Sequence, residues 1–336
     1  MAREGRSHVR KRKKGCLVGC LTNLLLVLGV AALLFAGAHV LGFVKSDPQT
    51  GAPTLRFDNL PEIKLGDFDL SKIELPDVSK LTEKLPKWAY GVNPNGLTIK
   101  TLRAGDGEAV FVCADGYTML VGAGSGTGAA LCGQLLLCGV NHLSAAVAMG
   151  SEDEQLSAMK MALGLTRPDY LFVPPTQTKG KAYAQMIDAA EKQGTQIVSA
   201  TQNMAFTLGR ARVTFIGPAR TQHTDSRDDG LTLRIDYGET SAVVTGCITA
   251  SGEKEIVASG AAVKCDALVA ARGGSEAATC TEWVEAAKPG VALVTGKNPA
   301  NSVRIRLQKA GATVYAAKEN GVMTLYSDGQ RITVQP

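Results

Sequence analysis

Short apolar segments alternate with amphipathic ones along residues 95–336, and this alternation constrains the fold more than any other feature of the sequence. Short β-branched runs between turns rich in glycine and aspartate predict strands, and longer segments with helical periodicity predict helices. The predicted strands are 97–102, 109–113, 118–121, 145–149, 170–173, 231–236, 241–246, 266–271 and 291–295, with three short ones at the end of the chain; the predicted helices are 127–138, 153–163, 181–192, 252–259, 281–287 and 302–310. Because this mixture recurs in two similar halves, it predicts an α/β sandwich in which two sheets pack face to face with helices outside.

The first 44 residues predict a membrane anchor. Residues 1–14 carry seven Lys/Arg and one acidic residue, and an uncharged run follows from Gly15 to Val44. That run is longer than the roughly 20 residues a spanning helix needs, and the positive-inside rule places the tail in the cytoplasm. The alternative is a signal peptide cleaved near residues 36–38. Either reading exports the remainder; we predict a cytoplasmic tail (1–14) and one transmembrane helix (15–44) in the cell membrane.

Residues 45–94 predict an extended extracellular stalk. Prolines are spaced through the whole segment, at positions 48, 53, 61, 76 and 86. Proline at this density disfavours helix and favours extended backbone. The alternative for part of this segment is a short docking strand or a partner-binding stretch.

The positive charge of the chain belongs to its tail. The net charge is +5, of which residues 1–14 contribute +6 and residues 45–94 contribute −1. Residues 95–336 contain twenty-two basic and twenty-two acidic residues and are neutral. A neutral domain lacks the broad positive field that holds nucleic acid nonspecifically, although a local basic patch remains open.

Six of the eight cysteines fall within residues 95–336, without CxxC or other metal-type spacing. Cys132 and Cys138 are six positions apart on one predicted helix, so their side chains point to different faces. Unpaired cysteine behaves as a small hydrophobe. We therefore predict mostly free, buried thiols, with a disulfide among the others as the alternative.

Several motifs, taken in order, resemble one family. Residues 103–109 (RAGDGEA) stand where the family opens with Asp-Val-Gly-Gln-Gly-Asp-Ala, and residues 120–124 (LVGAG) resemble its Leu-Ile-Asp-Ala-Gly. Residues 243–248 (VVTGCI) resemble its Leu-Leu-Thr-Gly-Asp-Ile, and residues 271–275 (ARGGS) its Gly-His-His-Gly-Ser. Residues 97–336 thus resemble the metallo-β-lactamase fold, specifically the exported hydrolase-like domain of bacterial ComEC-type competence (DNA-uptake) proteins. The resemblance implies a four-layer αββα sandwich for residues 95–336.

The metal-binding motifs of that family are lost in this sequence. Its His-x-Asp-x-Asp-His motif, which ligates metal and activates water, is replaced by residues 150–155 (GSEDEQ). Its bridging aspartate is replaced by Cys247 and its histidine pair by Arg272 and Gly273, and residues 298–303 hold no final histidine. The vestigial pocket positions are therefore Gly122, Gly150, Glu152, Glu154, Gln155, Cys247, Arg272 and Gly273. Because a two-metal hydrolytic site needs several imidazoles with carboxylates, we predict no catalytic residues, no metal and no cofactor.

Two other interpretations of the pocket positions remain open. Glu152, Glu154 and Cys247 could hold one cation, or Cys247 could act as a nucleophile. The more economical prediction is that Glu152 and Glu154 form an acidic cluster at the start of the following helix, where the helix dipole favours them. Arg272 is then expected to form a salt bridge with these carboxylates in the former metal cavity.

Four further features have simpler explanations than a site. Gly124-x-Gly126-x-x-Ala129 matches a dinucleotide fingerprint formally, but no acidic residue follows at the required distance. His142 and His223 are predicted to lie at the surface. Arg304, Arg306 and Lys309 on one late helix predict a solvated face, with anion binding as the alternative.

The sequence as a whole predicts a membrane-anchored, extracellular pseudoenzyme that acts as a binding or scaffolding module, linked to competence or other cell-surface machinery. Its expected partners are the membrane and an extracellular protein or nucleic acid. The alternatives are a divergent phosphodiesterase-like or nuclease-like hydrolase with a non-standard site, and a nucleic-acid receptor without hydrolysis.

Overall fold

The structure is a computed structural model that describes residues 44–46, 53–55, 95–105, 107–176 and 180–335. The predicted tail, nearly all of the predicted span and most of the predicted stalk lie outside these residues. Within them, no helix is both long and apolar enough to cross a membrane. The last residue of the predicted span, Val44, lies in β1 (Val44–Ser46), which pairs antiparallel with β2 (Pro53–Leu55). This small sheet belongs to the first unit of the chain, 1–70, and the domain described below to the second, 71–336.

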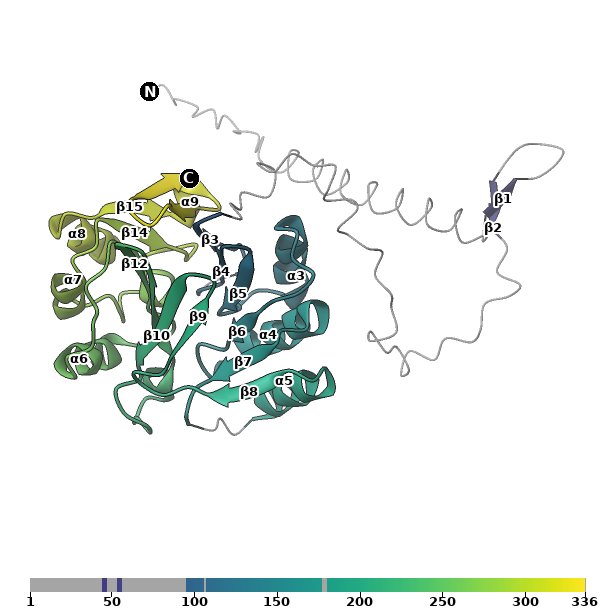
Figure 1. The fold of residues 1–336 in the computed structure, drawn as a ribbon, viewed down its shortest axis with the longest axis horizontal. Coiled ribbons are helices and arrows are strands. Elements are labelled where there is room, and N and C mark those ends of the chain that lie inside the picture. Colours follow the sequence, from purple (N-terminus) through teal and green to yellow (C-terminus); the bar gives the residue numbers. More distant parts are fainter. Residues whose placement is uncertain (1–43, 47–52, 56–94, 106, 177–179, 336) are drawn as a thin grey trace, which may run out of the picture. The chain divides into compact units, whose positions relative to one another are not determined.

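The first large sheet has eight strands in the order β17-β16-β3-β4-β5-β6-β7-β8 (Figure 1). Strands β17 to β5 pair antiparallel, and β5 to β8 pair parallel. The strands are β3 (Leu97–Thr101), β4 (Val110–Ala114), β5 (Tyr117–Val121), β6 (Ala145–Val147), β7 (Tyr170–Val173), β8 (Gln196–Ser199), β16 (Thr324–Ser327) and β17 (Ile332–Gln335). Helices α3 (Gly128–Leu137), α4 (Asp153–Thr166) and α5 (Lys181–Lys192) follow strands β5, β6 and β7, respectively.

The second large sheet repeats this plan with seven strands in the order β15-β14-β13-β12-β11-β10-β9. Strands β9 to β12 pair antiparallel and β12 to β15 parallel. The strands are β9 (Ala205–Leu208), β10 (Ala211–Gly217), β11 (Thr232–Tyr237), β12 (Thr240–Val244), β13 (Ala267–Val269), β14 (Val291–Val294) and β15 (Thr313–Ala316). Its helices are α6 (Ala250–Ala258), α7 (Thr281–Ala287), α8 (Asn301–Lys309) and the single turn α9 (Ala317–Asn320).

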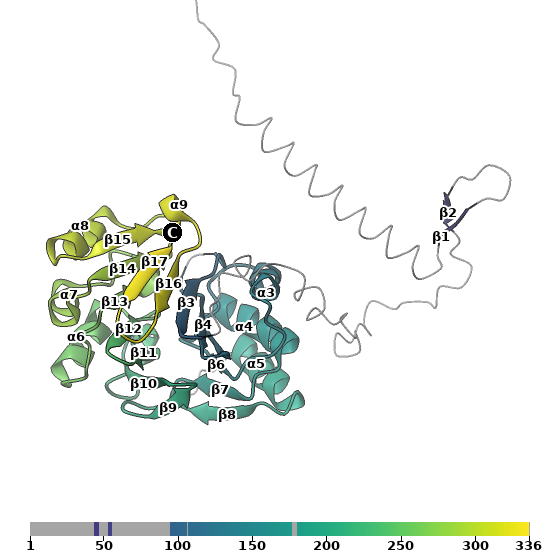
Figure 2. The same ribbon diagram turned by 45° about the horizontal axis from the view of Figure 1, so that its top comes forward.

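Three apolar clusters hold the layers together. The central cluster, which includes Val112, Phe215 and Ile235, fills the space between the two sheets. A second cluster lies between the first sheet and α3–α5, and a third, around Trp283, lies between the second sheet and α6–α8. Helices therefore cover the outer face of each sheet (Figures 1 and 2). The four-layer αββα sandwich predicted for the domain is confirmed.

The predicted elements agree with the observed ones to within a few residues at their ends, with one gap. Strands β8, β9 and β10 lie between residues 196 and 217, where the sequence predicted no element. β8 is a short strand with exposed or half-buried side chains, whereas β10 is largely buried and its alternating sequence, ARVTFIG, carried a strand signal that the prediction missed. Tertiary packing decides the state of a segment such as β8.

The topology gathers several loops at one edge of the sandwich. Parallel strands end at the same edge of a sheet, so the loops after β5 and β6 lie together, as do those after β12, β13 and β14. Carboxyl ends of parallel strands are where α/β proteins place ligands. This edge therefore carries the candidate site.

Candidate functional site

Gly150 and Cys247 meet at the centre of this edge. Gly150 follows β6 in the first sheet, and Cys247 follows β12 in the second. A Cβ atom built on Gly150 would lie 2.2 Å from the Cys247 sulfur. The thiol, which is 2% exposed and donates to the Met149 carbonyl oxygen at 3.7 Å, thus occupies the space that a side chain at position 150 would need.

An arginine-carboxylate pair crosses the edge beside them. Arg272, in the loop after β13, places Nη1 3.5 Å from Glu152 Oε1 and donates to the Cys247 carbonyl oxygen at 3.0 Å. Gln155 Nε2 donates to the other oxygen of Glu152 at 2.7 Å. Arg272 has the left-handed φ of 51°, and its buried Nε has no partner among the described residues. The predicted salt bridge is therefore formed, but with Glu152 alone.

A buried glutamate that the sequence analysis did not select completes the arrangement. Glu108 is 1% exposed, and its Oε1 accepts a hydrogen bond from the Gly273 N–H at 2.7 Å. Burial raises the pKa of Glu108 to about 8, against the lowering effects of that bond and of Arg272. At neutral pH the carboxyl is therefore mainly protonated. The signal for this residue was present, since Glu108 stands where the resembled motif ends in Asp-Ala.

Of the remaining vestigial positions, Gly273 and Gly122 lie at the edge, whereas Glu154 does not. Gly273 lies at the edge through its bond to Glu108, and Gly122 packs its backbone against the Glu108 carbonyl. Glu154 is exposed in the first turn of α4, with Glu152 as the N-cap residue. The acidic helix start is confirmed for both glutamates, whereas the prediction that Arg272 bridges to Glu154 as well is wrong. The side chain of Glu154 leaves the pocket because α4 carries it to the solvent face.

The residues at this edge do not fit the metal pair that the fold family implies. Glycine at 150 offers no donor atom, and Arg272 adds a positive charge where a metal would need a neutral or anionic ligand. Within the described part of the chain, no group of three or more His, Cys, Asp or Glu side chains is arranged to hold a metal ion.

The Cys247 thiol is also a poor nucleophile. Burial, followed by the nearby carboxyls of Glu108 and Glu152, raises its pKa far above the usual value. Nucleophilic cysteines need the opposite, a lowered pKa beside a base or a helix N-terminus. The other five described cysteines are free as well; Cys132 is half-buried and the rest are buried.

Replacing Arg272 with alanine is expected to lower the free energy of unfolding by about 1–2 kcal/mol, because it removes a charged donor from the Cys247 carbonyl and from Glu152. Arg272→Gly loses the same contacts but tolerates the positive φ, so we expect it to be more stable than the alanine variant by about 1 kcal/mol. Urea denaturation measures both values. An unchanged midpoint for Arg272→Ala would show that the pair contributes nothing to cohesion.

The glycine-rich loop after β5 is explained by backbone packing. Gly124 and Gly126 approach the Ala104 backbone so closely that a Cβ on either would lie within 2.6 Å of it. Gly126 N–H donates to the Ala104 carbonyl at 2.6 Å, and Thr127 caps α3. These contacts account for the glycines without a dinucleotide.

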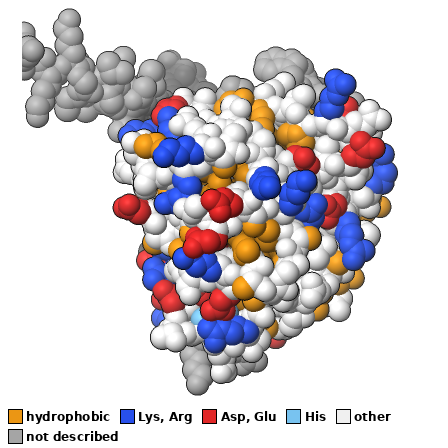
Figure 3. All heavy atoms as spheres, turned by 90° about the vertical axis from the view of Figure 1, so that its left-hand side faces the viewer, with side chains coloured by type: hydrophobic (Ala, Val, Ile, Leu, Met, Phe, Trp, Pro, Cys, Tyr) orange, Lys and Arg blue, Asp and Glu red, His pale blue; other side chains and the backbone are white. Residues whose placement is uncertain are grey.

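The basic residues of α8 are engaged by the protein itself. Arg304 forms an ion pair with Glu319 at 2.6 Å, and Arg306 donates to the Thr279 carbonyl. Lys309 is exposed near the end of the helix. On the face of the molecule that carries α6–α8, basic and acidic side chains are interspersed (Figure 3). Anion binding on α8 stays a prediction, with two of its three groups already bonded to protein.

The two histidines of the domain differ. His142 is exposed and pairs with Asp169 at 3.1 Å, as a surface residue would. The prediction for His223 is wrong: its side chain is 4% exposed and bonds to Asp229 at 2.8 Å and to Glu255 at 2.9 Å. The polar loop before β11 packs on α6, so Asp229 of the same loop and Glu255 of α6 enclose the ring.

These layers and this edge define the class of the molecule, an α/β sandwich consistent with the metallo-β-lactamase fold. No family model matches the chain. Among curated proteins, ComE operon protein 3 of Bacillus subtilis (strain 168) is 20% identical over 191 residues, which are 55% of this chain and 25% of that protein. The chain thus matches about a quarter of the length of this relative.

Solved structures similar to the chain include three proteins at low identity. YhfI of Bacillus subtilis, a metallo-β-lactamase fold protein, is 16% identical with a TM-score of 0.45 and covers 67% of this chain and 98% of its own. CmlA, a diiron β-hydroxylase of Streptomyces venezuelae, is 13% identical with a TM-score of 0.48; the match covers 70% of this chain and 55% of CmlA. Igni18, a metallo hydrolase of Ignicoccus hospitalis KIN4/I, is 13% identical with a TM-score of 0.42; the match covers 71% of this chain and 99% of Igni18. The layers and the strand order assign the fold. The resemblance predicted from the motifs is confirmed for the fold.

Proposed function

We propose that this chain is a non-hydrolytic binding or scaffolding module built on a metallo-β-lactamase-like sandwich. One observation carries the proposal: the position of the first motif histidine is Gly150, and the space for its side chain is filled by the Cys247 sulfur. The Arg272–Glu152 pair supplies cohesion across the same edge without an ion. A site rebuilt in this way is suited to holding its own loops together, not to activating water.

Metal content and hydrolysis test this proposal directly. The purified full chain, incubated with zinc and manganese, is expected to hold less than about a tenth of an equivalent of either, because tight binding needs a complete set of deprotonated ligands. Hydrolysis of bis-p-nitrophenyl phosphate and of single-stranded DNA is expected to equal that of the buffer. One tightly held equivalent that is lost in Glu152→Ala or Cys247→Ala, together with turnover, would establish the divergent hydrolase instead.

We further propose that the module is exported and anchored by its N-terminal segment, beside competence or other surface machinery. The uncharged run 15–44 behind a basic tail supports the anchor, and the similarity to ComE operon protein 3 supports the setting. Alkaline phosphatase fused to the C-terminus is expected to be active in cells, since the enzyme needs export to fold. An inactive fusion, with an active cytoplasmic reporter at the same position, would contradict this topology.

A further inference from the structure

A cavity opens at the same edge of the sandwich, away from the Gly150–Cys247 contact. Its volume is about 420 Å³, and its walls come from the segment after β3, the loop after β14 and the α9 turn. Gly296 N–H donates to the Gly273 carbonyl at 3.0 Å, so this wall is continuous with the candidate site. The described residues that line the cavity are Thr101, Leu102, Arg103, Gly105, Thr295, Lys297, Ala317, Lys318 and Gly321.

The described residues on the walls of this cavity carry charge of one sign. Three of its described lining residues, Arg103, Lys297 and Lys318, are basic, and none is acidic. Residues 95–336 as a whole are neutral, so this is a local concentration and not a share of a general positive surface. Basic side chains from separate elements around one cavity form a site for an anion, which they attract most strongly where water is partly excluded.

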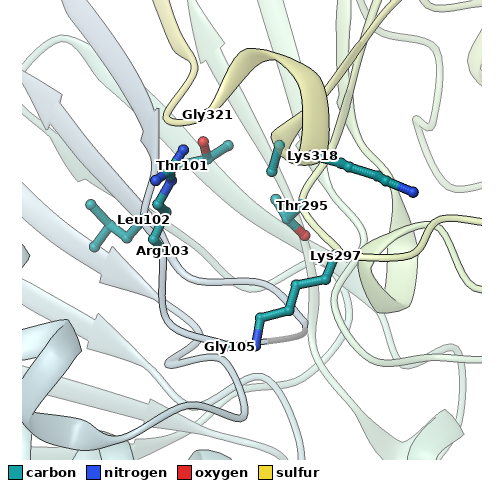
Figure 4. Close-up of a pocket in the computed structure, with 9 residues that line it drawn as sticks. Thr101, Leu102, Arg103, Gly105, Thr295, Lys297, Lys318 and Gly321 are labelled. Carbon is teal, nitrogen blue, oxygen red and sulfur yellow. The ribbon is translucent and has the colours of Figure 1, made fainter. Parts of the chain in front are cut away.

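The three basic side chains differ in how they lie around the cavity. The Arg103 backbone is fixed by Gln134, which accepts from its N–H at 2.6 Å and donates to its carbonyl. The Arg103 guanidinium lies against Gly321, where a Cβ would be 2.8 Å from Nη2. Lys297 extends toward Gly105, whereas Lys318 points outward from the rim (Figure 4). Arg103 and Lys297 thus line the cavity itself, and Lys318 stands at its rim.

Thr295 lies on the wall but does not present its hydroxyl to the cavity. It is 7% exposed, and its Oγ1 makes no hydrogen bond to any described residue, but that oxygen atom is itself closed off from the cavity. Recognition of a ligand therefore falls to the basic side chains.

We propose that this cavity binds a small phosphate-bearing ligand of about mononucleotide size, held by Arg103 and Lys297. Phosphate combines the negative charge and the several acceptor oxygens that guanidinium and ammonium groups recognise. The volume lies within the range of small-ligand pockets and, at about 30 Å³ per water, equals about 14 water molecules. The inference names the ligand class of the proposed binding module, and it rests on that proposal for binding without turnover.

Calorimetric titration of the purified full chain with adenosine 5′-monophosphate and with inorganic phosphate tests the inference. Both are expected to bind at low salt, the nucleotide more tightly, and Arg103→Ala and Lys297→Ala are each expected to weaken binding at least tenfold. Arg103→Lys keeps the charge and should retain part of the affinity. Lys160→Ala removes an exposed lysine on α4, far from the cavity, and should leave the affinity unchanged. Arg103 and Lys297 are exposed, so these variants should keep the melting temperature of the parent chain.

The outcomes separate this inference from the proposed function. Absence of binding by both probes, or equal binding by the parent chain and Lys297→Ala, overturns the cavity inference and leaves the metal and hydrolysis results as they stand. Binding followed by phosphate release keeps the cavity inference and overturns the non-hydrolytic proposal. A twenty-residue oligothymidylate that binds with steep salt dependence while the mononucleotide does not bind would overturn the small-ligand assignment in favour of a nucleic-acid receptor.

Discussion

Gly150→Ala is expected to destabilise the sandwich by about 2–3 kcal/mol. The new Cβ would lie 2.2 Å from the Cys247 sulfur, and that thiol is held in place beside the Met149 carbonyl, so one of the two loops must move. Urea denaturation at pH 7 measures the loss.

A double-mutant cycle gives this prediction its control. Cys247→Ala alone should cost about 1–2 kcal/mol as a small cavity, but in its presence Gly150→Ala should cost nothing more, a coupling of about 2 kcal/mol. Gly164→Ala is the matched glycine replacement: it lies in α4, and the nearest atom to its Cβ is 4.0 Å away. It should be neutral or slightly stabilising. Additive effects of the Gly150 and Cys247 replacements would mean that the sulfur does not fill the vacated space.

Stability should fall as the pH rises from about 5 to about 8, by about 3–4 kcal/mol from Glu108 alone. Burial raises the pKa of Glu108 from 4.5 to about 8, and that of Glu253 to about 7. A carboxyl whose pKa is higher in the folded state than in the unfolded chain binds more protons when folded. Its contribution is therefore complete below the unfolded pKa and is lost as the pH rises through the folded value.

Two isosteric variants test this dependence. Glu108→Gln keeps an oxygen acceptor for the Gly273 N–H but cannot ionise, so its stability should vary much less between pH 5 and 8. Glu253→Gln should remove a smaller part of the slope, because the pKa of Glu253 is raised less, to about 7. It should also lose stability at every pH, because Glu253 accepts from the N–H groups of Thr279 and Cys280, at 2.7 Å each, and the amide can replace only one of these bonds well. Glu154→Gln, at an exposed position, should leave the curve of the parent chain unchanged. A parent chain whose stability rises over this interval would show that these carboxyls are ionised in the folded state.

The vestigial pocket positions and the cationic cavity have different origins in the fold. The vestigial positions lie at or near strand ends, and the sequence motifs locate them. The cavity depends on the segment after β3, the loop after β14 and α9, which are far apart in the chain. In the sequence, Lys297 and Lys318 were ordinary basic residues without a motif. Arg103 stood inside one, but in a place where its side chain carried no recognised role.

The sequence alone determined the layers, most of the strands and helices, the acidic start of α4 and the loss of the motif histidines, because these follow from local periodicity and from the order of motifs. Tertiary structure decided which of those residues meet. The Cys247 sulfur fills the space at Gly150, Arg272 reaches Glu152 and not Glu154, Glu108 becomes a buried acid, and His223 is enclosed by Asp229 and Glu255. Each of these depends on loops from two sheets converging at one edge or on a loop packing against a distant helix. Such distances and burials are properties of the packed molecule, and no spacing along one chain segment encodes them.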